Sequence, residues 1–226
     1  MSLLAMAALC LCTKESPTNT GITNHNFSET SVSDVDSNHY SVIAIGTQLW
    51  MKESLRTTRY NDGSVIPYVA DNAAWTGLGA PAYCWYGNDS SAYKTVYGAL
   101  YNWYAVNSGK LAPAGWHVAS DSEWNVLITF LGADSLAGGK LKDTGITFWN
   151  SPNVGATNET GFSGLPAGYR AYDGSFSCLG TYGYWWTSSA NGAGVAWYRY
   201  FGYNFAEVGH SYTDARNGFC VRCIKD

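Results

Sequence analysis

The period of apolar and polar positions changes along the chain and divides it into segments. Residues 42–45 and 48–51 are two short apolar runs joined by Gly46 and Thr47, which predicts a β-hairpin. Between Tyr169 and Ile224, short alternating runs are interrupted by Gly and Asn, which predicts a series of antiparallel strands. The pattern therefore indicates a domain that begins near Ser41 and ends with strands.

Two helices are expected between these strand regions. Apolar residues recur at helical spacing between Ala92 and Lys110, and Gly109 stands where a helix stop is expected. Ser120 and Glu123 form a capping box, after which one apolar face recurs up to Gly132. Residues 116–118 are strand-like and lead directly into this second helix. The apolar faces of the two helices consist of Val96, Ala99, Leu100, Trp103 and Val106, and of Trp124, Leu127, Ile128 and Leu131.

A stretch of about thirty residues from Gly138 to Arg170 has little periodicity and many turn residues. Loops of this length are usually functional or held by packing. Two helices, short strands and long loops together predict an α+β fold.

The N-terminal residues differ from the rest in composition. Residues 1–12 join a short apolar run to Cys10 and Cys12, which is typical of the end of an export or lipoprotein signal. Either cysteine is a candidate for lipidation, and a trimmed or non-lipidated signal is the alternative. Residues 13–40 are rich in Ser, Thr and Asn, bury little, and are expected to form a flexible linker to a domain over residues 41–226.

Charge and composition exclude some classes of function. Only 13% of residues are charged, about half the usual quarter, and the formal net charge is −4 without charge runs. No electrostatic footprint for a phosphate backbone is present, so nucleic acid is not an expected partner. No apolar stretch approaches the ~20 residues of a membrane-spanning helix. The composition favours an exported, cell-surface protein whose only membrane attachment is an N-terminal lipid anchor.

Four further cysteines, in an exported chain, predict two disulfides among Cys84, Cys178, Cys220 and Cys223. Four cysteines allow three pairings, and the sequence does not separate them. A redox role for Cys220 and Cys223 is the alternative. It is disfavoured because the pair lies in a strand-like run and not at the start of a helix.

Several sequence blocks of the chain resemble those of a known family. The blocks that carry the likeness cover roughly Val42 to Asp226 and are IGTQLWMKESL, AYCWY, YGALYNWYAV, GWHVASDSEW, GGKLKDTG, NETGFSGLPAGYR, YWWTSS and NGFCVRCIKD. They resemble the Fibrobacter succinogenes major paralogous domain, which is also abundant in Bacteroidetes surface lipoproteins. The resemblance implies a C-type-lectin-like α+β fold with two helices, small twisted antiparallel sheets, long loops and a relationship to formylglycine-generating enzymes.

The chain departs from the family pattern at several positions. The family often has Cys where Ala112 stands and Ser where Cys220 stands, so the disulfide that the family would form at position 112 is absent. Cys178 and Cys220 look like additions to the pattern, which favours pairing them with each other and leaves Cys84 with Cys223.

Catalysis and metal binding have weak support. The related formylglycine-generating enzymes carry two cysteines separated by four residues, whereas Cys220 and Cys223 are separated by two in a strand-like run. His117 is expected to be structural, and Asp121 and Glu123 suit the first turn of a helix. No enzyme activity and no cofactor are expected. Calcium is a minor alternative, because four oxygen-bearing residues gather in the long loop: Asn150, Asn153, Asn158 and Glu159.

The stretch from Ala196 to Tyr212 carries the functional hypothesis. On a strand, Trp197, Arg199 and Phe201 point to one side while Tyr198 and Tyr200 point to the other. Large tryptophans are assigned to the core, namely Trp116, Trp124, Trp185, Trp186 and Trp197. Tyr, Asn and Ser make up adaptable binding surfaces, and Tyr also stacks on sugars. The candidate ligand-binding residues are Asn191, Tyr198, Tyr200, Tyr203, Asn204, Phe205, His210, Tyr212 and Asp214.

The predicted function is therefore that of a surface-exposed adhesin-like or receptor-like module for a protein or glycan ligand. Some members of the lectin-like group are diversified by retroelements, and the resemblance implies that Ser189 to Asn217 is the region varied. A subunit of a surface fibre is the alternative, and a formylglycine-generating-like enzyme comes third.

Overall fold

The computed structural model describes residues 29–132 and 134–226. The expected signal at residues 1–12 and residues 13–28 of the expected linker lie outside this part. The strands are β1 (Ser31–Ser33), β2 (His39–Ile45), β3 (Gln48–Met51), β4 (Tyr83–Cys84), β5 (Leu100–Tyr101), β6 (Trp116–Val118), β7 (Ala167–Arg170), β8 (Phe176–Leu179), β9 (Tyr182–Ala190), β10 (Val195–Gly202), β11 (Gly209–Asp214) and β12 (Cys223–Lys225). The helices are α1 (Asn72–Thr76), α2 (Ser90–Tyr97), α3 (Trp103–Val106), α4 (Asp121–Phe130) and α5 (Asp134–Leu141), with a 3-10 turn at Tyr86–Asn88.

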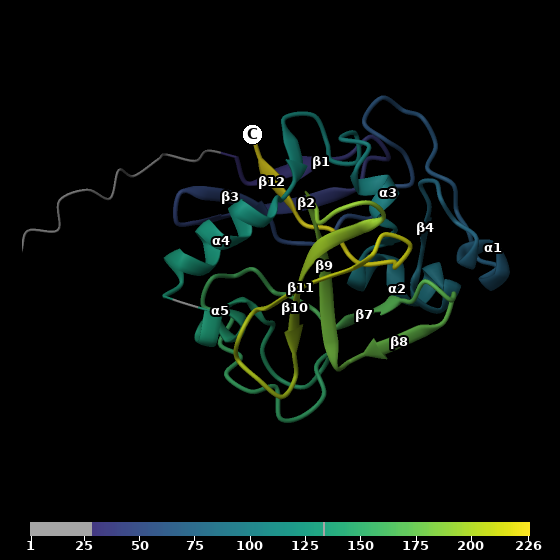
Figure 1. Cartoon of the computed structure of the whole chain (residues 1–226). Coiled ribbons are helices and arrows are strands. Elements are labelled where there is room, and N and C mark those ends of the chain that lie inside the picture. Colours follow the sequence, from purple (N-terminus) through teal and green to yellow (C-terminus); the bar gives the residue numbers. More distant parts are fainter. Residues whose placement is uncertain (1–28, 133) are drawn as a thin grey trace, which may run out of the picture.

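Small sheets and short helices make up an α+β fold, as predicted. One sheet has the order β1-β2-β3-β12-β6, a second has the order β11-β10-β9-β7-β8, and β4 pairs with β5. Figure 1 shows β9, β10 and β11 in the middle of the molecule, with α4 and α5 to their left and α1 and α2 to their right. The strand β12 lies between β3 and β6 and so joins β6 to the hairpin of β2 and β3.

The folded part begins before Ser41. β1 pairs with β2, so that Ser31 lies opposite Ser41. Asp34 accepts hydrogen bonds from the main-chain N–H groups of Asp36 and Asn38 and from the hydroxyl of Tyr40 at 2.5 Å. The end of the expected linker is therefore part of the sheet. Hydrogen bonds to the carboxylate of Asp34 stabilise this segment, which has few apolar side chains to bury.

Two local predictions are confirmed. β2 and β3 form the hairpin across Gly46 and Thr47, with Ile45 opposite Gln48. The side chain of Ser120 accepts from the N–H of Glu123, and Glu123 accepts from the N–H of Ser120, so the capping box starts α4.

The helix expected between Ala92 and Lys110 is interrupted, and the expectation of two helices was wrong. Gly98 is the C-cap of α2, and its φ of 80° lies in the left-handed region. A Cβ at this position would meet the carbonyl oxygen of Leu55 at 2.8 Å. The chain then forms β5 and the short α3, which Asn102 caps. A contact with a distant segment therefore overrides the local helical period.

A further helix occupies part of the region expected to be loop. α5 contains Gly138 and Gly139, and a Cβ on these residues would collide with the main chain of Glu207 and of Gly155, respectively. The two glycines allow α5 to pack directly against loop backbone. Residues 142–166 have no helix or strand, as expected for the long loop.

Two clusters of buried side chains lie on opposite sides of β9. Adjacent residues of a strand point to opposite faces, and Trp185 belongs to one cluster and Trp186 to the other. We call these the Trp185 core, which also holds Trp124, Phe162 and Phe201, and the Trp186 core, which also holds Trp116 and Phe219. The expected core positions of Trp116, Trp124, Trp185 and Trp186 agree with their burial in these clusters.

In the described part of the chain, no helix is long and apolar enough to cross a membrane.

His117 joins three segments at one end of the first sheet. Its Nδ1 lies 2.6 Å from Asp226 and its Nε2 lies 2.8 Å from Glu123 in the capping box. Burial alone would lower the pKa of His117, but the hydrogen bonds with Asp226 and Glu123 outweigh it and raise the pKa. The imidazolium therefore bridges β6, α4 and the C-terminal residue.

This bridge predicts a pH dependence of stability. The folded state holds the His117 proton more tightly than the unfolded chain, so its stabilisation is complete below the ordinary histidine pKa of about 6.5. We expect the stabilisation to be lost as pH rises through the higher pKa of the folded state. Thermal unfolding of His117→Gln between about pH 5 and 8 should show a weaker decline than the unsubstituted chain.

His210→Gln is the matched control. Burial and the neighbouring Arg199 lower the pKa of His210, so its contribution to the pH profile has the opposite sign. A profile that His117→Gln leaves unchanged would contradict the bridge.

Candidate ligand-binding site

The register of β9, β10 and β11 decides which side chains share a face. Tyr198 lies opposite Trp186 on β9 and opposite Ser211 on β11, whereas Arg199 lies opposite Trp185 and His210. Side chains directly opposite each other point to the same side of a sheet. Tyr198 and Tyr200 therefore lie on the side of the Trp186 core, and Trp197, Arg199 and Phe201 lie on the other side, as the alternation predicts.

Five tyrosines from three strands cover the first of these sides, and we call them the tyrosine face: Tyr169, Tyr182, Tyr184, Tyr198 and Tyr200. The ring of Tyr184 is central, because its centroid lies 5.1 to 6.0 Å from the centroids of the other four. Phe219 lies beneath, stacked on Tyr184 with centroids 5.1 Å apart. All five residues are partly buried, so part of the surface of each remains accessible.

A cavity of about 210 Å³ opens at this face. It is lined by Tyr169, Ala171, Tyr172, Tyr184, Tyr198, Thr213, Asn217 and Phe219. Asn217 is held in place, because its Oδ1 accepts from the N–H of Tyr172 and its Nδ2 donates to the hydroxyl of Thr213. None of the lining side chains carries a charge, and hydroxyl groups and aromatic rings dominate the wall.

Three hydroxyl groups of the tyrosine face, those of Tyr169, Tyr184 and Tyr198, stay protonated over a wide range of pH. Burial raises the pKa of Tyr184, and the nearby thiol of Cys178 adds to the effect. Burial also raises the pKa of Tyr169 and of Tyr198. These hydroxyls can both donate and accept hydrogen bonds, which suits a neutral polar ligand.

The other side of the same strands faces α4. The guanidinium of Arg199 is buried and donates to Asp121 at 2.8 Å and to Asn125 at 2.7 Å. Nε2 of His210 lies 2.9 Å from the same carboxylate of Asp121. Arg199 thus links the middle of β10 to the first turns of α4 by hydrogen bonds.

Trp197 is a correction to the predicted core. Its side chain is only partly buried, because the ring stacks on His210 at 4.4 Å and meets Tyr212 edge-on at 5.2 Å. Both partners are exposed, with Tyr212 55% accessible. The three rings form an aromatic group at the outer strand, on the side opposite to the tyrosine face.

The predicted ligand-binding residues therefore do not form one site. Tyr198, Tyr200 and Phe205 come together, since the ring of Phe205 lies 6.1 Å from that of Tyr200. His210 and Tyr212 lie on the opposite side. Tyr203 is partly buried and packs against the Trp185 core, and Asp214 is paired with Arg216 at 2.6 Å. Asn191 lies in the β9–β10 turn and Asn204 in the turn after β10.

Three members of the tyrosine face were not predicted from the sequence, namely Tyr169, Tyr182 and Tyr184. Tyr182, Tyr184 and Trp186 alternate with Gly183 and Trp185, so the period-two pattern was a usable signal for one shared face. Tyr169 had no such signal, because it joins the face only through the pairing of β7 with β9.

The turn that carries Phe205 is held by a buried lysine. Nζ of Lys142 donates to the carbonyl groups of Val154, Gly202 and Phe205 at 2.8, 2.8 and 2.7 Å. Burial lowers the pKa of Lys142 to about 8. One side chain therefore joins the long loop to the end of β10 beside the tyrosine face.

Three of the four loop residues considered for calcium have side chains bonded within the protein. Nδ2 of Asn153 donates to the carbonyls of Asp143 and Gly145, Asn158 is bonded to Ser163, and Glu159 pairs with Lys140 at 3.1 Å. Asn150 is exposed. In residues 29–132 and 134–226, no group of three or more His, Cys, Asp or Glu side chains is placed to hold a metal ion.

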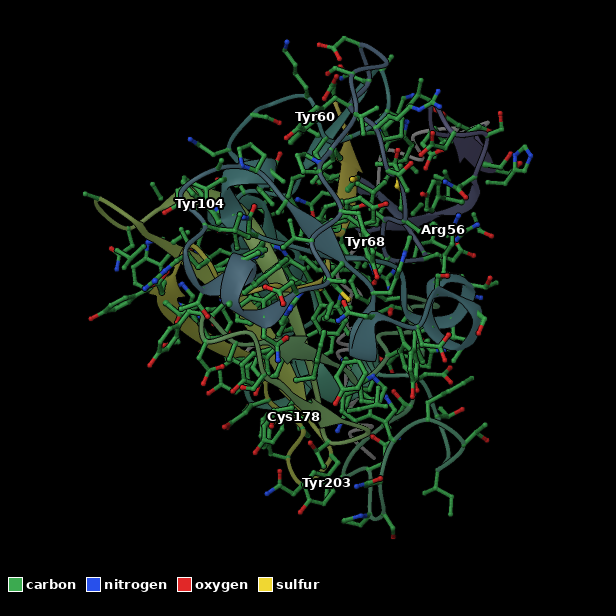
Figure 2. All side chains as sticks on the ribbon, turned by 90° about the vertical axis from the view of Figure 1, so that its right-hand side faces the viewer. Arg56, Tyr60, Tyr68, Tyr104, Cys178 and Tyr203 are labelled. Atoms are coloured by element: carbon green, nitrogen blue, oxygen red, sulfur yellow. The ribbon has the colours of Figure 1, made fainter. Side chains whose placement is uncertain are left out.

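The expected disulfides are absent from the structure, in which Cys84, Cys178, Cys220 and Cys223 are all free. The pair Cys84 and Cys223 is divided between the Trp185 core and the Trp186 core. Cys220 also lies in the Trp185 core, whereas Cys178 lies beside Tyr184 on the other side of the sheet. Figure 2 shows Cys178 and Tyr203 toward the lower end of the molecule, far from Tyr60. The expected pairing was wrong because the strands separate the members of each pair.

Lys142→Met tests the lysine anchor. Removing the ammonium leaves three buried carbonyl groups without their donor, so we expect the free energy of unfolding to fall by about 2–4 kcal/mol. Lys140→Met is the matched control, because it removes only a partly exposed ion pair and should cost less than about 1 kcal/mol. Chemical denaturation of the two variants measures the difference. Equal losses would show that Lys142 is no anchor.

Comparison with known proteins places the chain in a family. Searches of curated proteins and of solved structures gave no match. The sequence profile described as the Fibrobacter succinogenes major domain matches residues 43–225, from β2 to β12 and including the tyrosine face. The chain belongs to the Fibrobacter succinogenes major domain family.

Proposed function

We propose that the chain is a surface-exposed ligand-binding module that holds its partner on the tyrosine face. The observation that carries this proposal is the gathering of five partly exposed tyrosines from three strands, of which Tyr169, Tyr184 and Tyr198 line one cavity. Tyrosine offers a large contact area at low cost in side-chain entropy, together with a hydroxyl group that bonds in either direction. A face of such rings is suited to binding, because part of its aromatic surface remains accessible.

The chemistry of the cavity favours a neutral, polar ligand. Its lining residues carry no charge, so a charged ligand would lose hydration without gaining an ionic partner. Aromatic rings stack on the apolar faces of sugars, and the hydroxyl groups bond their polar edges. A glycan therefore fits the face best, and an uncharged segment of a protein is the second choice.

Export and tethering are part of the proposal. The signal-like residues 1–12 and the low charge content support a protein held at the cell surface by an N-terminal lipid. Retroelement diversification of Ser189 to Asn217 would reach the part of the face on β10, where the partly exposed Tyr198 and Tyr200 alternate with the buried Arg199 and Phe201. A near-identical template repeat beside the gene would support that part, and its absence would remove it without affecting binding.

Catalysis by a cysteine is disfavoured, because the thiols of Cys220 and Cys223 are buried. Cys220 and Cys223 are buried, and burial raises the pKa of Cys220 to about 12 and raises that of Cys223 further. The thiolate form that a nucleophile or redox centre needs is therefore suppressed. Binding accounts for the face without a reactive group.

The test begins with an array of neutral oligosaccharides and continues with calorimetry on the best binder. Tyr198→Ala and Tyr200→Ala should each weaken binding by about tenfold or more. Tyr198→Phe should cost about two- to tenfold if the hydroxyl bonds the ligand, because the ring is retained.

Tyr68→Ala is the matched control, since Tyr68 is 45% exposed but lies beside β4 and outside the face. Binding that survives both alanine substitutions on β10 would refute the tyrosine face as the site. An array without any binder would refute a neutral glycan as the ligand.

A further inference from the structure

The outer edge of the second sheet is an unpaired strand. β11 is the last strand in the order β11-β10-β9-β7-β8, and it pairs with β10 over its whole length from Gly209 to Asp214. Figure 2 shows the yellow-green strands of this sheet at the left-hand edge of the molecule. An exposed strand edge is a template for pairing with another chain.

The register identifies which main-chain groups are free. The N–H of Ala215 donates to the carbonyl of Gly194, so the hydrogen-bonded pairs of this antiparallel ladder continue at every second residue through Thr213, Ser211 and Gly209. The N–H and C=O groups of His210 and Tyr212 point away from β10. Within the described part of the chain, no hydrogen bond to these groups is present.

Other sheet edges are blunted. β1 and β6, the outer strands of the first sheet, have three residues each. β8 has four residues, and its Cys178 has a left-handed φ of 66° that breaks the regular ladder with β7. β11 has six residues without Lys or Pro, the residues that commonly protect an edge.

We propose that β11 pairs with β11 of a second copy of this chain, antiparallel and centred on Tyr212, to form a two-fold symmetric dimer. In this register Tyr212 exchanges both main-chain hydrogen bonds with its own counterpart. His210 lies opposite Asp214 of the second copy, and the same contact recurs by symmetry. An imidazole opposite a carboxylate can donate a hydrogen bond from one strand to the other.

The side chains along this edge suit a second copy. His210 and Tyr212 are exposed, and with Trp197 they form the aromatic group on the α4 side. Two-fold pairing brings the two aromatic groups side by side and buries rings that a monomer leaves in water. Tyr198 and Tyr200 point to the opposite side, so the tyrosine face of each copy stays open.

Sedimentation equilibrium of the whole chain tests the pairing. We expect the unsubstituted chain to be a dimer, and Tyr212→Pro to halve the weight-average mass because proline removes the outward N–H. No bond to β10 is lost, so far-ultraviolet circular dichroism and thermal unfolding should stay close to those of the parent. Tyr212→Ala keeps the N–H and should still dimerise, more weakly.

Cysteine cross-linking tests the register. Tyr212→Cys should form a disulfide-linked dimer under mild oxidation, because residues 212 of the two copies are opposite each other. Ser211→Cys should cross-link much less, because residue 211 faces residue 213. The unsubstituted chain, treated in the same way, shows any cross-linking through its own cysteines.

A monomeric parent chain, or a dimer that Tyr212→Pro leaves intact, would overturn the proposal. Equal cross-linking of Ser211→Cys and Tyr212→Cys would overturn the register. A monomer that binds an extended peptide along β11 would replace the second copy by a different occupant. Oligosaccharide binding that Tyr212→Pro leaves unchanged keeps this proposal separate from that of the tyrosine face.

Discussion

The loops of this protein depend on buried cationic side chains that donate to main-chain carbonyl groups. Lys142 donates to three carbonyls of the long loop and the turn after β10. Arg170 donates to the carbonyls of Val69, Ala70 and Gly174, and Arg222 to those of Met51, Phe162 and Ser163. A chain with long irregular segments leaves many carbonyl groups without a helix or sheet partner, and each costs free energy if it is buried unpaired. These three side chains satisfy several carbonyls each, so the desolvation of a charge is offset by fixed hydrogen bonds.

The tyrosine face is rigid because such contacts hold it from two directions. On the α4 side, Arg199 joins the middle of β10 to Asp121 and Asn125. At the end of β10, Lys142 holds the carbonyls of Gly202 and Phe205. A face that is fixed before binding loses little entropy when a ligand arrives. The site is therefore made by the scaffold beneath the tyrosines as much as by the tyrosines themselves.

Sequence patterns predicted those features that depend on neighbouring residues. The Ser120 capping box, the turn at Gly46 and the alternation along β10 are local, and the structure contains all three. The break at Gly98 arises from the approach of Leu55, and the burial of Lys142 arises from carbonyls of Val154, Gly202 and Phe205, which no local pattern encodes. Trp197 was assigned to the core by its size, but its ring contacts the exposed rings of His210 and Tyr212. Two of the five tyrosines of the candidate site were predicted, because Tyr198 and Tyr200 share one strand, whereas Tyr169 reaches them only through the pairing of β7 with β9.

Alternation along β10 also separates the side chains that the fold needs from those that the proposed ligand would contact. Arg199 and Phe201 are buried, so a change at either position would disturb the contact with α4 or the Trp185 core. Tyr198 and Tyr200 lie between them on the other side and contact mainly other tyrosines and Phe219. A different polar or aromatic residue at these two positions would alter the chemistry of the face while the hydrogen bonds beneath it stay in place. The register of β11 on β10 leaves the main-chain groups of His210 and Tyr212 at the outer edge of the sheet. Pairing with a second copy at this edge would leave both tyrosine faces accessible. The strand geometry would thus permit one scaffold to combine the proposed binding face, made by side chains, with the proposed pairing edge, made by main-chain groups of β11.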